Sequence, residues 1–158
     1  MTDERPQRVN LRTMSTPDRK PYLGFRVSGH SYAVDMTCLQ ELIKYRSPTR
    51  VPRTDVSVAG LISLRGQVIT VFDLRRLLTL GAAPAGEPTR ILVVRERDGE
   101  EATGLIVDEV TRVWRLASTD VEEIAHPGED GLWGVAHIGQ ERIGLIDLFQ
   151  ILSRIGLG

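Results

Sequence analysis

The chain has 158 residues, of which 41% are hydrophobic and 26% charged, and its formal net charge is −1. This length fits one compact domain or two small fused subdomains, and the composition is ordinary for a globular protein. The near-neutral charge gives no electrostatic reason to bind nucleic acid or an anionic membrane. A single cysteine excludes an internal disulfide and suits a reducing cytoplasm. No stretch approaches the roughly 18–20 apolar residues that span a bilayer, so we expect no direct membrane insertion.

The first 20 residues are polar and show no hydrophobic periodicity. They contain basic side chains but no apolar core of the kind found in a signal peptide. We therefore expect a disordered N-terminal arm over residues 1–20 and a folded domain over residues 21–155.

The segment after this arm predicts a hairpin followed by a helix. The segments Phe25-Arg26-Val27 and Tyr32-Ala33-Val34 flank the turn residues Ser28-Gly29-His30, as in a β-hairpin. The next apolar side chains follow helical spacing at Leu39, Leu42 and Ile43. This spacing predicts a helix over residues 37–45.

The most informative feature is a 19-residue pattern that occurs twice, 74 residues apart. Residues 60–78 and 134–152 each read as a strand, a glycine turn, a second strand and a short helix. Asp73 and Asp147 precede the two helical patterns and can cap them. A fixed offset with matched apolar positions predicts a duplicated supersecondary unit.

The stretch 81–89, which is rich in glycine, alanine and proline, predicts a linker between two halves. In the second half, apolar runs around Asp98-Gly99 predict another hairpin, and residues 104–107 match residues 33–36 at an offset of 71. We predict an all-β fold of two small barrels, the first mainly 21–80 and the second mainly 90–155. The sequence leaves open whether the barrels exchange elements.

No residue pattern predicts a catalytic or metal site. Cys38 has apolar neighbours, which favours a buried thiol over a nucleophile, and helix capping explains Asp73 and Asp147 better than acid–base chemistry. The histidines lie in separate segments without the close spacing of zinc ligands: His30, His126 and His137. We expect no enzyme activity, metal or cofactor. A small cysteine- or carboxylate-dependent enzyme remains the distant alternative.

Arg65 stands in a Leu-Arg-Gly turn between two apolar runs. The simplest interpretation is an exposed turn arginine. A guanidinium at a strand end can also hold a carboxylate of this chain or of a partner. Glu41 is a candidate partner, although sequence distance neither supports nor excludes it.

Four segments together resemble the chemotaxis coupling protein family, the CheW-like adaptors: 22–25, 32–42, 58–75 and 104–110. The resemblance covers roughly residues 21–155. It implies two SH3-like five-stranded β-barrels around a shared core, with short helices that include a C-terminal one. It also implies a cytoplasmic adaptor that bridges the tip of chemoreceptors to the regulatory domain of a CheA-like histidine kinase.

The resemblance further implies an apolar receptor-binding groove formed by Met36, Leu39, Leu42, Val107 and Val110. It implies a charged pair between Arg65 and Glu41 beside that groove, and recruitment to membrane receptor arrays through partners. No cofactor is implied.

Two positions depart from the family pattern, since Ser63 stands where asparagine is usual and Thr70 where proline is usual. Threonine restores a backbone N–H and favours a strand, so we expect the strand through Thr70 to be kept. The alternative function is a CheW-like regulatory domain of a divergent pathway, including one without a motility output. A fusion to a receiver domain is expected less, because no receiver-sized segment follows in this sequence.

Overall fold

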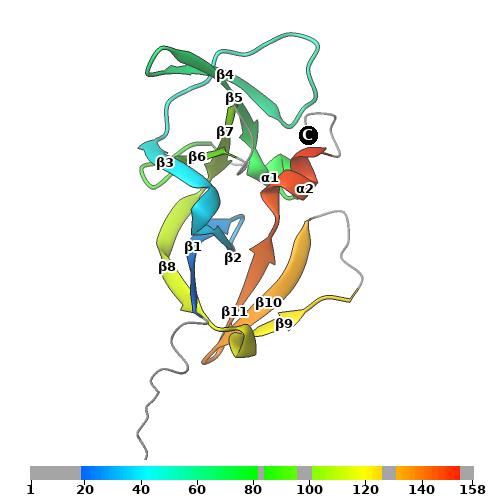
Figure 1. Ribbon diagram of the computed structural model, residues 1–158. Helices are drawn as coiled ribbons and strands as arrows, with labels where there is room; N and C mark the ends of the chain where they lie inside the picture. The colour runs from blue at the N-terminus through cyan, green and yellow to red at the C-terminus, as the bar shows by residue number, and fades with distance from the viewer. Residues whose placement is uncertain (1–18, 82–83, 96–100, 126–130, 154–158) are drawn as a thin grey trace, which may run out of the picture.

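The computed structural model describes residues 19–81, 84–95, 101–125 and 131–153. Within these ranges the strands form two β-sheets, which Figure 1 shows one above the other, with the two α-helices near their junction. Most of the expected arm over residues 1–20, the turn Asp98-Gly99 and His126 lie outside the described residues. Lys20, the last residue of that arm, already belongs to the first strand.

Sheet A has the strand order β8-β1-β2-β11-β10-β9. Its strands are β1 (Lys20–Val27), β2 (His30–Asp35), β8 (Glu109–Leu116), β9 (Val121–Glu123), β10 (Leu132–Ile138) and β11 (Glu141–Ile146). The three-residue β9 brings this sheet to six strands, one more than expected. The helix α2 (Leu148–Ser153) follows β11, and the 3-10 turn η3 (Ser118–Asp120) precedes β9.

Sheet B has the strand order β3-β6-β7-β5-β4. Its strands are β3 (Leu39–Lys44), β4 (Val58–Leu64), β5 (Gln67–Asp73), β6 (Arg90–Arg95) and β7 (Ala102–Val107). The helix α1 (Leu74–Leu77) follows β5, and the 3-10 turn η2 (Met36–Cys38) precedes β3. β5 runs through Thr70, which pairs with Leu61 on one side and Thr103 on the other, as expected.

The duplicated unit predicted from the sequence is confirmed, because β4-β5-α1 and β10-β11-α2 share their pairing register. In both hairpins the register shifts at the same place, between Val58 and Gly60 in one and between Leu132 and Gly134 in the other. Aspartates cap both helices: Oδ1 of Asp73 accepts from Arg75 N at 3.0 Å, and Oδ1 of Asp147 accepts from Phe149 N at 3.1 Å. The match extends to the third strand, since Gly104 pairs with Val71 in parallel and Ala33 pairs with Leu145 in parallel.

The sheets do not follow the expected division into residues 21–80 and 90–155. The first hairpin, β1-β2, pairs with strands of the second half, while the hairpin β6-β7 pairs with strands of the first half. The chain therefore passes from sheet A to sheet B through η2 and returns between β7 and β8. Each sheet contains a hairpin from the other half of the chain, so neither half forms a complete sheet by itself.

The helix predicted over residues 37–45 is wrong. Only the 3-10 turn Met36–Cys38 is helical, and Leu39–Lys44 form β3, which pairs with β6. The burial of β3 alternates with a period of two, and this alternation puts Leu42 on the exposed face. The pairing with β6 has a register shift between Leu39 and Glu41. A short apolar run fits either period, and pairing with a buried strand decided between them.

Three apolar clusters hold the sheets. One lies within sheet A and one within sheet B, while the largest joins both sheets and both helices. The shared cluster includes fully buried Phe25 from sheet A and Leu92 and Leu105 from sheet B, together with Leu74 of α1 and Leu148 of α2. The relative placement of the sheets is thus fixed by burial of apolar surface common to both.

Gly60 lets a neighbouring segment lie close against β4. Its φ is +145°, and a Cβ there would meet the carbonyl of Thr49. The backbones of Thr49 and Leu61 exchange two hydrogen bonds of 2.8 Å, which cover part of the edge of sheet B. In the duplicate, Gly134 lies against β9 in the corresponding way.

We predict that Gly60→Ala lowers the free energy of unfolding by more than ~2 kcal/mol, because the backbone of Thr49 cannot yield as a flexible side chain would. Chemical denaturation measures the loss. The matched control is Gly66→Ala, where φ is +79° but no atom lies within 4 Å of the added Cβ. It should cost only about 1 kcal/mol. Equal losses in both variants would contradict this account.

Candidate functional site

The expected groove residues lie at the two places where the chain crosses between the sheets. Met36 and Leu39 belong to η2 and the start of β3, while Val107 and Val110 flank the passage from β7 to β8. Met36, Leu39 and Val110 are half-buried and pack against the shared cluster. Leu42 is 40% exposed. We refer to these four side chains together as the junction strip: Met36, Leu39, Leu42 and Val110.

Val107 is not part of an exposed surface, which corrects the expectation. It has no exposed area, because β7 lies between β6 and β5 and its last side chain enters the shared cluster. A partner on the outside cannot touch it in this arrangement. Its contribution is to pack beneath the junction.

Arg65 and Glu41 are brought together as expected. Nη2 of Arg65 donates to Oε2 of Glu41 at 2.7 Å, and the two side chains are 76% and 24% exposed. Arg65 and Gly66 form a two-residue turn with φ of 53° and 79°, the signature of a type I′ hairpin turn. In the duplicated unit the corresponding left-handed position is Gly139, with φ of 60°. The first unit thus keeps a charged side chain where glycine satisfies the backbone better.

A buried arginine network was not foreseen from the sequence. Nε and Nη2 of Arg75 donate to the two carboxylate oxygens of Asp73 at 2.8 and 3.0 Å, and Nη1 donates to Oδ1 of Asp108 at 3.0 Å. The Arg75 side chain is only 6% exposed. Hydrogen bonds to Asp73 raise the pKa of the Arg75 guanidinium above its ordinary value. The only local signal was an arginine two residues after a helix-capping aspartate, which does not reveal the distant Asp108.

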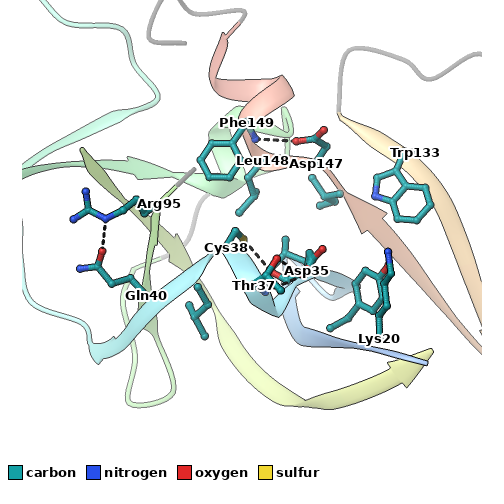
Figure 2. Close-up of a pocket in the computed structure, with 14 residues that line it drawn as sticks. Lys20, Asp35, Thr37, Cys38, Gln40, Arg95, Trp133, Asp147, Leu148 and Phe149 are labelled. Atoms are coloured by element: carbon teal, nitrogen blue, oxygen red, sulfur yellow. Dashed lines mark hydrogen bonds between the residues drawn. The ribbon is translucent and has the colours of Figure 1, made fainter. Parts of the chain in front are cut away.

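A cavity of about 740 Å³ opens beside Cys38, with walls from both sheets and from α2. Figure 2 shows Trp133, Phe149 and Lys20 around it, and the contact between Arg95 and Gln40 at one side. Its two carboxylates are already used locally, because Asp35 accepts from Thr37 and Asp147 caps α2. Both carboxylates therefore have a structural role as acceptors of nearby backbone N–H groups.

The Cys38 thiol is poorly suited to nucleophilic chemistry. Its Sγ donates to the carbonyl of Asp35 at 3.0 Å. Burial raises the pKa of the thiol to about 11, and the Asp35 carboxylate adds to the rise. Reactive cysteines need the opposite shift, because the thiolate is the nucleophile.

The histidines that the structure describes lie apart from one another. Nε2 of His137 is 3.0 Å from Oε1 of Glu122, an exposed pair on β10 and β9, and His30 begins β2. Across the described ranges, no group of three or more His, Cys, Asp or Glu side chains could hold a metal ion.

The fold and the junction define a class of protein, a β-scaffold of two small subdomains joined by a shared core. The chain belongs to the CheW-like domain family, whose model matches residues 21–156. This membership places it among the signalling adaptors of chemotaxis, and it confirms the family resemblance found in the sequence.

Similar proteins include the chemotaxis protein CheW of Bacillus subtilis, which is 38% identical over 98 residues that span 62% of each chain. The chemotaxis protein CheW of Helicobacter pylori is 29% identical over 130 residues, or 82% of this chain and 78% of that protein. Among solved structures, the scaffolding protein TtCheW of Thermoanaerobacter tengcongensis matches with a TM-score of 0.75 and 26% identity. That match covers 82% of this chain and 89% of the other, and it supports two SH3-like β-subdomains.

We predict that alkylation of Cys38 by iodoacetamide is at least about tenfold slower at pH 7.5 than that of an exposed cysteine, because little thiolate is present. The rate should keep rising with pH towards the thiol pKa of about 11. The control is Val68→Cys in a Cys38→Ser background, since Val68 is 72% exposed. Its rate should level off near pH 9. A plateau for Cys38 by pH 8.5 would contradict the raised pKa.

Proposed function

We propose that this protein is a non-enzymatic adaptor that couples the cytoplasmic tip of chemoreceptors to the regulatory domain of a CheA-like histidine kinase. Membership of the CheW-like family supports this role, as do relatives named as chemotaxis and scaffolding proteins. No helix in the described part of the chain is long and apolar enough to cross a membrane. The proposed adaptor works in the cytoplasm and reaches membrane receptor arrays through its partners.

The junction strip is the observation that carries the proposal. Leu42 is 40% exposed on the edge strand β3, and Met36, Leu39 and Val110 are only partly covered by the shared cluster. A receptor tip is a helical hairpin, and the apolar face of a helix seats on such a strip. Receptor binding would cover surface that the isolated chain leaves in water.

Arg65 forms an exposed ion pair with Glu41, the residue before Leu42 in β3. An exposed pair of this kind adds only about 0–1 kcal/mol to stability. Its proposed role is to orient a guanidinium that a receptor or kinase carboxylate can share. The adaptor then acts by holding two partners at once, which raises their local concentration and fixes their geometry.

The same site in a divergent pathway, including one without a motility output, is the alternative. A cysteine- or carboxylate-dependent enzyme has less support, because the Cys38 thiol has a raised pKa and the nearby carboxylates serve as caps. We propose no cofactor.

We predict that Leu42→Asp weakens binding of a receptor-tip fragment by about tenfold or more, because the carboxylate must lose its water on contact with an apolar helix. Isothermal titration with a purified receptor helical hairpin measures the affinity. The melting temperature should change little, because Leu42 is 40% exposed.

The matched control is Val68→Asp, which places the same charge on sheet B at a side chain that is 72% exposed and lies outside the junction strip. It should bind the receptor hairpin like the parent chain. Parent-like affinity in Leu42→Asp would refute the strip as the receptor site.

We predict that Arg65→Gly leaves the free energy of unfolding within about 1 kcal/mol of the parent, since relief of the left-handed turn offsets the lost pair. The same variant should lower receptor-stimulated kinase activity in a reconstituted assay. Arg65→Lys should restore that activity only in part, because an ammonium lacks the planar fork. Full kinase activation with Arg65→Gly at parent concentrations would refute the role of Arg65.

A further inference from the structure

The buried Arg75 network reaches both sheets through one residue, Asp108. Asp108 stands between β7 and β8, where the chain returns from sheet B to sheet A. Its Oδ1 accepts from Arg75 of α1, and its Oδ2 accepts from the backbone N–H of Ser28 at 2.7 Å. The backbone N–H of Asp108 donates to the carbonyl of Arg26 at 3.0 Å. One carboxylate therefore ties the β1-β2 turn of sheet A to the helix end of sheet B.

A second contact ties the same turn to sheet B. The hydroxyl of Ser28 donates to the carbonyl of Gly81 at 2.7 Å, in the segment that follows α1. Asp73 is the other partner of Arg75. Its backbone N–H donates to the carbonyl oxygen of Ser57 at 2.8 Å, which fixes its position in sheet B. Arg75 and Asp73 are thus fixed on the sheet B side, and Asp108 directly follows β7 of the same sheet. The link to sheet A runs through Asp108, whose Oδ2 and backbone N–H bind Ser28 and Arg26.

Asp108 is close in sequence to Val110, one residue of the junction strip. Asp108 directly follows buried Val107 and precedes Val110 by two residues, whereas Leu42 stands on β3 of the opposite sheet. A displacement of Asp108 would move Val110 relative to Leu42. The position of Val110 relative to Leu42 would then follow from where Arg75 holds Asp108.

We propose that Arg75 is a positioning residue for the junction strip, because by bridging Asp73 and Asp108 it sets the orientation of the two sheets. The inference rests on the proposed receptor site for its functional consequence, although not for its structural one. A buried ion pair adds little net stability over apolar packing, whereas its directional hydrogen bonds specify one geometry. Arginine suits this task because its planar fork serves two carboxylates at once.

Distances between spin labels, measured by double electron–electron resonance on the full chain, test the orientation. Cysteines replace Val68 on sheet B and Arg142 on sheet A, which occupy matching exposed positions of the duplicated unit. Cys38→Ser removes the native thiol and keeps a donor for the carbonyl of Asp35. This labelled chain is the parent for all variants.

Two variants disturb the bridge to different degrees. Arg75→Lys retains the charge but cannot span both carboxylates, and Asp108→Asn removes one ionic partner while keeping the shape of the side chain. Each should broaden or shift the distance distribution and weaken receptor-hairpin binding by about two- to thirtyfold. Asp108→Asn keeps the test informative if Arg75→Lys fails to fold, since Asp108 is 31% exposed.

Arg76→Gln is the matched control. Arg76 is the next residue, its side chain is 46% exposed, and its Nε lies 4.0 Å from Asp73 without reaching Asp108. It should reproduce the parent distances and affinity. A parent-like distance distribution in the folded Asp108→Asn variant would overturn the proposal. If distances shift while Leu42→Asp still binds receptor normally, the orienting role stands and the proposed receptor site fails instead.

Discussion

The relative orientation of the two sheets depends on the hydrogen bonds that Arg75 makes with Asp73 and Asp108. Placing a guanidinium in the interior is costly unless its hydrogen bonds are satisfied, and Asp73 and Asp108 provide three of them. Because one carboxylate caps α1 and the other marks the return to sheet A, the requirement to satisfy one cation constrains both sheets. Burial of the shared apolar cluster holds the sheets together but is non-directional. The hydrogen bonds of the Arg75 network are directional, so they specify one relative orientation of the sheets.

The same junction leaves apolar side chains partly exposed. The chain crosses between the sheets twice, and each crossing carries side chains of the junction strip, with Met36 and Leu39 at the first and Val110 at the second. Burial of Val107 beneath them anchors the second crossing in the core. A surface whose side chains are partly exposed and backed by a packed core suits an adaptor, because a preorganised site loses less conformational entropy on binding.

The two copies of the duplicated unit have the same backbone and different surfaces. Both share a register shift, an aspartate cap and a parallel third strand, which are the features that folding requires. They differ at the hairpin tip, where Arg65 in one copy corresponds to Gly139 in the other. A left-handed arginine is less favourable than glycine there, so the backbone does not explain it. Its contact with Glu41 and its exposure fit a role at the surface.

The sequence by itself determined the hairpins, the capped helices and the duplicated unit, because turn chemistry, capping and short-period hydrophobicity are local properties. The pairing of Arg65 with Glu41 was implied by the family resemblance and not by a local pattern. It also determined the family, through motifs spread over most of the chain. Only the tertiary structure decided that Leu39–Lys44 is a strand, since six residues fit either period until β6 pairs with them. It also decided the exchange of hairpins, the burial of Val107 and the bond between Arg75 and Asp108. These depend on contacts between residues far apart in the chain, and no local pattern encodes which distant strand or carboxylate will be the neighbour.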